Sequence, residues 1–441
     1  MQSLAAHSPR SRRRWPLVLA AVVVLGAAVA GIAIALHTSG SGGGTGDGSK
    51  SKVSAGQGST AASSGSAARG FTVVAVTPQT GSAGVASNAT VSVRFSSSPA
   101  ADGPHPSLDP PVSGHWASAS NSLVFHATAP LVPGSSETVT VPGGQSGVRD
   151  AAGGHLSHKV TATFTVADGS THRLQEVLAQ LGYLPLAYVP PSPAPATADL
   201  AEPQPGSLTW RWTMPTSLTS LWLTGSPNVI TKAAVMTFER QNGLTVDGVA
   251  GPDVWKALLS DVARGKGGDT TPYSYVYVSK TPLPETLTLY VNGAVKYGGV
   301  LVNTGASGAT TLDGTYPVFE HVKASDMKGT NITGSTYNDP TVPWASYFNG
   351  GDALHGFVRS HYGYPQSNGC VEMPISQAAL VWPFTPIGTL VTVVGLPNTP
   401  PKTPATTTTT TAPPATTTTA PPPAPTPAPT TTAPPPATPP A

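Results

Sequence analysis

The sequence is poor in cysteine and in charged residues. Cys370 is the single cysteine among 441 residues, which excludes an intramolecular disulfide and a zinc site built from several thiolates. Charged residues make up 10% of the chain, and the formal net charge is +2. So little charge gives no electrostatic indication of a nucleic-acid partner. We expect no nucleic-acid partner, and we expect no cofactor.

Glycine and proline are abundant instead, with 47 and 48 residues. They concentrate in linker-like stretches, and 441 residues are too many for one hydrophobic core, so a modular and mainly β chain is expected. The expected segments are a basic cytoplasmic N-terminus (1–16), a transmembrane anchor (17–36), a Gly/Ser linker (37–69), a β-sandwich (70–168), a small three-helix domain (169–266), a mostly β domain that carries Cys370 (271–396) and a disordered Pro/Thr-rich tail (397–441).

Residues 17–36 are an uncharged apolar run, long enough to cross a hydrocarbon core of ~30 Å. Arginines between residues 10 and 14 precede the run and favour a cytoplasmic N-terminus. We expect a single-pass anchor in the cell membrane with the rest of the chain outside. The alternative is a cleaved signal peptide, because Ala28-Val29-Ala30 is typical of a cleavage site. Both interpretations place the remainder outside the cytoplasm.

Residues 70–168 contain short runs in which apolar and polar residues alternate between turn residues, which predicts a β-sandwich. The expected strands are 72–76, 90–95, 122–125, 137–141 and 160–166. Five histidines are scattered here without acidic or thiol partners at a ligand spacing, so no metal site is expected. Through Thr77-Pro78 and residues 91–95, the segment resembles bacterial Ig-like modules.

Residues 169–266 change to a helical period. The first helix places apolar residues at 174, 177, 178 and 181 on one face and is capped by Ser170 or Thr171. The second spans 232–241, with Thr231 as its cap and Gly243 at its end, and the third begins at Pro252. With residues 244–252, this pattern resembles the three-helix peptidoglycan-binding module, interrupted by an insertion at 190–228.

The resemblance implies docking onto glycan or peptide stems. The alternative is a small helical core that packs against the next domain. Trp210, Trp212 and Trp222 lie in the insertion. They can stack on sugars, although aromatic residues in a loop more often form local core.

The domain at 271–396 is predicted to be mostly β. Expected strands are 273–279, 286–291, 300–303, 316–319 and 390–394, with one helix at 375–381. Asn292-Gly293 predicts a two-residue hairpin. Residues 323–352 are polar and rich in Gly, Asn and Tyr, so we expect a long loop that acts as a lid over an active-site groove.

Cys370 follows Ser367, Asn368 and Gly369. A lone thiol outside the cytoplasm is either buried and inert or a working nucleophile. Gly369 permits a tight turn whose amides converge on an oxyanion, and a loop can bring His355 to the thiol as its base. These residues alone leave both interpretations open.

Resemblance decides between them. His355-Gly356, the Ser367 to Cys370 run and the stretch 305–318 resemble the L,D-transpeptidases of bacterial cell walls, and the likeness extends over about 273–394. It implies that Cys370 attacks the third residue of a stem peptide and that His355 acts as base and then acid. It also implies amides near Gly369 as an oxyanion site and meso-diaminopimelate at the reacting positions.

The residues leave two details of the site open: the group that orients His355 and the effect of Glu372. The resemblance implies a backbone carbonyl near Gly356 as the group that orients His355, and Asp352 is the competing candidate. Many members carry Arg where this chain has Glu372, which leaves open a contact to the substrate carboxylate. Arg359, Tyr362 and Tyr364 are expected to line the groove, with Arg359 as a carboxylate clamp.

Several alternatives remain. His361 is a rival base, although it lacks the adjacent glycine. A carboxypeptidase would give the same thioester to water, and a wall-binding scaffold would have a dead site. Sortases share the His-before-Cys order but use a downstream Arg, and no Arg follows Arg359; papain-type peptidases place Cys first. We expect a monomer whose partners are donor and acceptor stem peptides. The tail is expected either to thread the wall or to be a disordered overhang.

Overall fold

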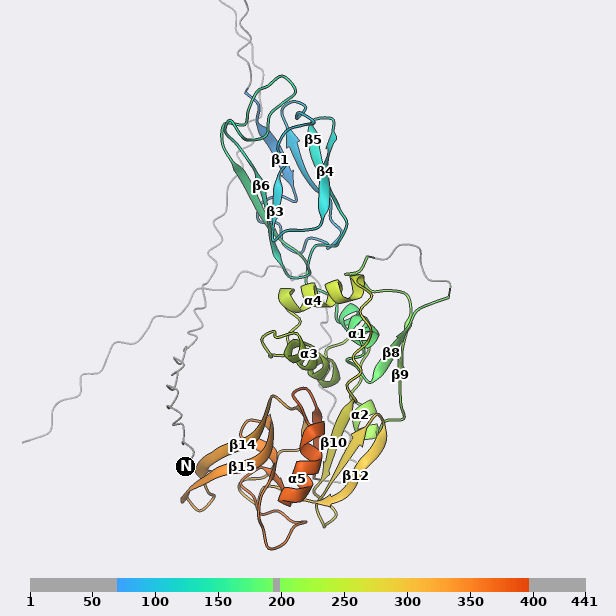
Figure 1. Ribbon diagram of the computed structural model, residues 1–441, viewed down its shortest axis with the longest axis vertical. Helices are drawn as coiled ribbons and strands as arrows, with labels where there is room; N and C mark the ends of the chain where they lie inside the picture. The colour runs from blue at the N-terminus through green and yellow to red at the C-terminus, as the bar shows by residue number, and fades with distance from the viewer. Residues whose placement is uncertain (1–69, 193–198, 396–441) are drawn as a thin grey trace, which may run out of the picture. The chain divides into compact units, whose positions relative to one another are not determined.

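The computed structural model describes residues 70–192 and 199–395 (Figure 1). The expected anchor, linker and Pro/Thr-rich tail lie outside these residues. Within the described ranges, every helix is too short or too polar to traverse a bilayer.

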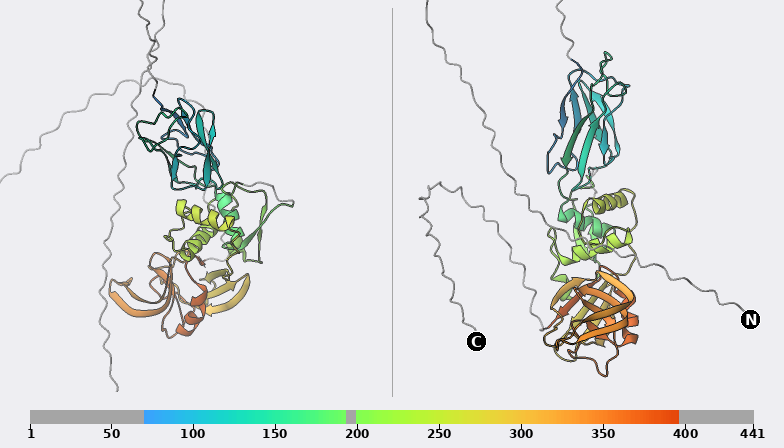
Figure 2. Two further views of the ribbon diagram at one scale, coloured as in Figure 1. Left: turned by 45° about the horizontal axis from the view of Figure 1, so that its top comes forward. Right: turned by 90° about the vertical axis from the view of Figure 1, so that its left-hand side faces the viewer.

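Residues 70–166 form two antiparallel sheets (Figure 2). Their strand orders are β1-β2-β5-β4 and β3-β6-β7. The strands are β1 (Val73–Thr77), β2 (Val91–Phe95), β3 (Ser107–Asp109), β4 (Gly114–Ala119), β5 (Ser122–Ala127), β6 (Ser136–Val141) and β7 (Val160–Thr165). Alternate residues such as Val91, Val93 and Val139 are at most 1% exposed and form the core between the sheets. The sandwich is confirmed. β3 and β4 went unpredicted, because one is very short and the other lacks apolar alternation.

The next residues form four helices and a hairpin. The elements are α1 (Thr171–Gln180), β8 (Leu186–Val189), β9 (Ser207–Trp210), α2 (Thr216–Thr219), α3 (Val229–Gln241) and α4 (Pro252–Ala263). Ser170 caps α1 as predicted, accepting a hydrogen bond from Arg173 N at 3.1 Å. β9 and α2 lie within the insertion and β8 lies just before it; none of the three was predicted. Trp210, Trp212 and Trp222 pack against the hydrophobic core, as the local-core interpretation expects.

The predicted cap of α3 was wrong. Asn228 caps the helix, and its Oδ1 accepts a hydrogen bond from Thr231 N at 2.9 Å. Thr231 therefore lies in the first turn rather than before it. Val229 and Ile230 are β-branched and resist the helix, so sequence alone favoured a later start. Gly243 has φ +67° just after the helix, as expected for a left-handed closing residue.

The C-terminal part of the described chain contains two sheets, with strand orders β12-β11-β10-β18-β13 and β14-β15-β16-β17. Its elements are β10 (Ser274–Ser279), β11 (Thr286–Val291), β12 (Ala294–Leu301), β13 (Gly314–Pro317), β14 (Glu320–Thr330), β15 (Thr336–Asn349), β16 (Asp352–Gly356), β17 (Val371–Met373), α5 (Ile375–Val381), η1 (Trp382–Phe384) and β18 (Leu390–Val394). One apolar cluster joins Val276, Leu287 and Val391 of the first sheet to Leu354 and Val371 of the second.

The expected loop at 323–352 is instead a long antiparallel hairpin of β14 and β15, paired from Glu320 and Tyr347 to Thr330 and Thr336. The prediction failed because the outer part of the hairpin buries little apolar surface. Its strands are held by backbone pairing, which apolar alternation in the sequence does not report. Only near its base do residues such as Ala345 and Phe348 enter the core.

Candidate active site

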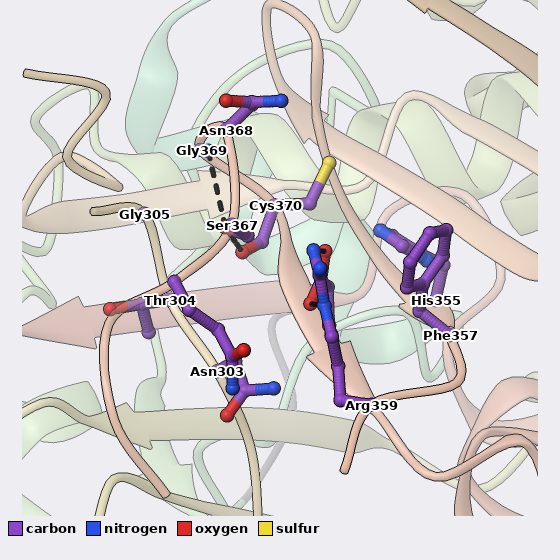
Figure 3. Close-up of polar contacts among 12 residues, drawn as sticks. Asn303, Thr304, Gly305, His355, Phe357, Arg359, Ser367, Asn368, Gly369 and Cys370 are labelled. Atoms are coloured by element: carbon purple, nitrogen blue, oxygen red, sulfur yellow. Dashed lines mark hydrogen bonds and ion pairs between the residues drawn. The ribbon is translucent and has the colours of Figure 1, made fainter. Parts of the chain in front are cut away.

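The two strands that carry the site lie side by side. β16 pairs with β17 in parallel, with Leu354 opposite Val371 and His355 opposite Glu372. Cys370 immediately precedes β17. His355 therefore lies on the neighbouring strand β16, two residues further along the strand direction than Cys370. With strands about 4.8 Å apart and a rise of about 3.3 Å per residue, the two Cα atoms are roughly 8 Å apart. The pairing thus places an imidazole and a thiol on neighbouring strands (Figure 3).

His355 is 3% exposed. Its Nδ1 lies 3.2 Å from the carbonyl oxygen of Gly356, and Phe357 packs edge-on against the ring. Burial lowers the pKa of His355, so the ring is neutral at neutral pH. If Nδ1–H donates to Gly356 O, Nε2 keeps its lone pair and can accept a proton. The orienting carbonyl expected near Gly356 is therefore that of Gly356 itself.

Cys370 is partly buried, and this burial raises the pKa of its thiol to about 12. The backbone of Ala353 opposes the shift, while the carboxylates of Asp352 and Glu372 add to it. The sulfur points toward Gly351 O at 3.7 Å. Among the described residues, no hydrogen bond joins Sγ to the His355 ring. The resting site consequently holds a protonated thiol that needs a base.

The turn before Cys370 is fixed from both ends. Ser367 Oγ donates to Cys370 O at 2.6 Å and accepts from Gly369 N at 3.2 Å. Thr311 Oγ1 accepts from Gly305 N at 2.8 Å and donates to Gly369 O at 2.6 Å. Gly369 has φ +121°, and a Cβ there would collide with Asp352 Oδ1, so glycine is required.

Of the amides near Gly369 that were expected to hold an oxyanion, that of Gly369 itself is therefore already engaged. The role of Thr311 was not predicted, because its two partners lie on different segments of the chain. A hydroxyl six residues after Gly305 gives no local signal for a contact with Gly369.

Three family models match successive parts of the chain. Residues 67–166 match a bacterial Ig-like domain, residues 223–258 a peptidoglycan binding domain, and residues 274–393 an L,D-transpeptidase catalytic domain. This chain carries an L,D-transpeptidase catalytic domain. The match covers both β16 and β17 and therefore both His355 and Cys370.

Solved structures with similarity to the chain include L,D-transpeptidases. The L,D-transpeptidase from Mycobacterium smegmatis is 12% identical, with 74% of this chain and 99% of that chain covered and a TM-score of 0.26. L,D-transpeptidase 3 from Mycobacterium tuberculosis is 12% identical, with 73% and 98% covered and a TM-score of 0.26. The catalytic domain of the E. faecium enzyme is 22% identical, with 29% and 100% covered and a TM-score of 0.25. No curated protein matches the chain.

On one side of the nucleophile in the L,D-transpeptidase domain, Arg359 and Glu372 form a bidentate pair. Arg359 Nε and one terminal nitrogen lie 2.8 and 2.7 Å from the two oxygens of Glu372. The guanidinium also lies over the Phe357 ring, 4.7 Å from its centroid. Arg359 was expected to clamp a substrate carboxylate, but its fork is occupied by a carboxylate of this chain.

The other predicted groove residues are Tyr362 and Tyr364. Tyr362 Oη accepts from Arg359 N at 3.1 Å, so it braces the loop after β16. Tyr364 is 38% exposed. His361, the rival base, is exposed and contacts Ser360 Oγ at 3.2 Å. None of these contacts brings a second imidazole to Cys370.

On the other side of the nucleophile, the L,D-transpeptidase domain has an open hollow of about 590 Å³. Residues from three stretches of chain line it: 308–310 and 312, 349 and 351–352, and 368–369. Asn368 Nδ2 donates to Asn331 Oδ1 at 2.7 Å, which joins the turn before Cys370 to the tip of the β14–β15 hairpin. The segment expected as a lid is therefore in contact with the motif, although as a hairpin rather than a loop.

Proposed function

We propose that this protein is a peptidoglycan L,D-transpeptidase that joins two stem peptides through a thioester on Cys370. The observation that carries the proposal is the placement of a neutral, buried imidazole on the strand next to the only thiol, within the matched catalytic domain. A neutral base beside a protonated thiol suits acyl transfer by general-base catalysis, because the proton must leave the sulfur as it attacks.

In the first step, the Cys370 side chain turns from Gly351 O toward His355. Nε2 takes the thiol proton while Sγ bonds to the carbonyl carbon of the donor stem. The same proton then passes to the leaving amine as the C–N bond breaks, and His355 returns to its neutral form. The developing oxyanion is assigned to the Cys370 amide, since the Gly369 amide is held by Ser367.

In the second step, an amine of another stem attacks the thioester carbonyl. A C–N bond forms, the C–S bond breaks, and the sulfur regains a proton through His355. The thioester has to survive until this amine arrives. The match to a peptidoglycan binding domain supports a wall substrate, because docking on the polymer would hold donor and acceptor near the thiol.

The experiment combines intact mass with product analysis. We expect a donor tetrapeptide to add an acyl group to the wild type and none to Cys370→Ala. With an acceptor stem present, we expect a cross-linked dimer. A trimmed stem without dimer would instead identify a carboxypeptidase, which the open hollow beside the sulfur favours as second candidate because it admits water. No adduct on wild type would identify a scaffold.

We also propose that the enzyme acts outside the cytoplasm, as a monomer anchored in the cell membrane by residues 17–36. This rests on the apolar run and the preceding arginines. Membrane fractionation together with protease treatment of spheroplasts tests it. Recovery of the protein in the cytosolic fraction would contradict it, and recovery in the medium would favour the cleaved signal peptide.

A further inference from the structure

Asp352, the first residue of β16, carries a carboxylate that is not neutralised. Among the ion pairs of the described residues, none involves Asp352. Among the residues that the structure describes, its one side-chain hydrogen-bond partner is the uncharged amide of Asn349, at 3.5 Å. Burial raises the pKa of Asp352 to about 6. A partly buried carboxylate without a cation is costly to keep, and such groups often serve a substrate.

The position of this carboxylate connects the hollow to the nucleophile. Asp352 and Gly351 both line the hollow, and Gly351 O is the atom that the Cys370 sulfur contacts. Asp352 Oδ1 lies against Gly369, directly before the nucleophile. Its charge is also felt by the thiol, whose pKa it helps to raise. The carboxylate thus lies in the wall of the hollow and against the residue that directly precedes the nucleophile.

We propose that Asp352 is the acceptor-side residue of this enzyme: it binds the ammonium group of the second substrate in the hollow and takes one of its protons. The inference rests on the proposed function, since it concerns the amine that resolves the thioester. It assigns this hollow to a cationic primary amine.

The acceptor enters as R–NH3+, and one proton moves to the Asp352 carboxylate, which leaves neutral R–NH2. The nitrogen attacks the thioester carbonyl, the new C–N bond forms and the C–S bond breaks. The second amine proton passes through His355 to the departing sulfur. Asp352 then releases its proton to solvent, so the net products are an amide, the free thiol and one proton.

The groups named next neither neutralise Asp352 nor replace it as a binding group for an ammonium ion. Its charge reaches Cys370 and the phenol of Tyr316, neither of which is a cation. Asn349 and Asn368 line the hollow as neutral amides and can hold polar parts of an acceptor. Glu372, the other carboxylate beside the thiol, is already paired with Arg359.

The test separates acylation from aminolysis in the full-length protein. Wild type and Asp352→Asn are acylated with a donor tetrapeptide, followed by intact mass. An acceptor stem with a side-chain amine is then added, and dimer is compared with hydrolysed donor. We expect acylation within about threefold of wild type, but a dimer-to-hydrolysis ratio lowered by at least about tenfold, since loss of a general base typically costs about 10²–10⁴ in rate. The rise of aminolysis with pH near the Asp352 pKa of about 6 should disappear.

Two controls make the result specific. Asp326→Asn removes an exposed carboxylate from β14 and keeps an oxygen for its hydrogen bond from Thr341 N, and it should behave as wild type. Hydroxylamine, an amine that is uncharged at neutral pH, should resolve the thioester equally well in all three proteins. An unchanged dimer ratio in Asp352→Asn, or an equal loss with hydroxylamine, would overturn the inference alone. A wild type that is never acylated would overturn the proposed function itself, and the inference with it.

Discussion

Cys370 lies between two carboxylates whose surroundings differ. Glu372 is held by two hydrogen bonds from the Arg359 guanidinium. Asp352 faces a hollow and has, within the described part of the chain, only the Asn349 amide as a side-chain partner. Both charges push the pKa of the thiol upward. Nearness to a nucleophile therefore does not define the role of a carboxylate. The role depends on whether the carboxylate is paired, because only an uncompensated charge is available to an incoming cation.

The paired side has a structural logic of its own. Arg359 lies over Phe357, and Phe357 packs edge-on against His355. Glu372 therefore holds the Arg359 guanidinium in place. The guanidinium in turn holds the Phe357 ring beside the His355 imidazole. An ion pair at this position holds the base in place rather than binding substrate. The unpaired side, by contrast, is open to solvent through the hollow.

The largest effect is expected from His355→Ala, which removes the proposed general base. Loss of a general base typically costs about 10²–10⁴ in rate. We expect acylation of Cys370 to slow by that factor while the domain stays folded, measured by intact mass over time and by thermal unfolding. His361→Ala is the matched control and should acylate like wild type. A melted domain in His355→Ala would show that this buried histidine is structural.

Much of the catalytic domain could be predicted from the sequence. Strands with strong apolar alternation, such as 286–291 and 390–394, and the helix at 375–381 were placed correctly. The Asn292-Gly293 hairpin was also correct, with φ of +50° and +79°. These elements follow from local chemistry, namely side-chain period and turn residues.

What could not be predicted depends on contacts between distant residues. The β14–β15 hairpin is polar, so its pairing leaves no period in the sequence. The Arg359–Glu372 pair spans a loop of unknown path, although a Glu between apolar neighbours could have signalled a buried cation nearby. The hollow beside Asp352 is formed by three separate stretches, which no local pattern brings together.

The second prediction concerns loss of the ion pair between Arg359 and Glu372. Glu372→Gln removes the charge opposite Arg359, whose side chain is 31% exposed while that of Glu372 is 6% exposed. A charge-assisted pair of this kind contributes about 2–4 kcal/mol when one partner is lost. We expect the free energy of unfolding to fall by that amount in chemical denaturation. The double variant Arg359→Gln/Glu372→Gln should lose less than the sum of both singles; strict additivity would mean that the pair does not couple.

The third prediction uses another unpaired carboxylate, remote from the nucleophile in sequence. Glu239 is 0% exposed; its Oε2 accepts from the amides of Asp247 and Gly248, while Oε1 lacks a partner among the described residues. Burial raises its pKa from 4.5 to about 7. A raised pKa means that stability is full below 4.5 and is lost as the pH rises through 7.

Glu239→Gln should remove that loss. We expect the variant to gain about 1–3 kcal/mol over wild type at alkaline pH and nothing in acid, measured as the difference in unfolding free energy across the pH range. A gain that is independent of pH would show that Glu239 does not titrate in the folded protein. Asp326→Asn again serves as the control for removal of an exposed charge.

The smallest effect is expected on the reactivity of the Cys370 thiol when the unpaired carboxylate of Asp352 is removed. Removing the Asp352 charge lowers the pKa of the Cys370 thiol, because a neighbouring anion no longer opposes the thiolate. Alkylation of Asp352→Asn by iodoacetamide should therefore be severalfold faster than that of wild type at the same pH, with the rate–pH curve moved to lower pH. A slower reaction would mean that the carboxylate does not act on the sulfur. A variant that is alkylated faster but resolved more slowly by an amine would separate the two roles, since damage to the fold would not improve the nucleophile while impairing its acceptor.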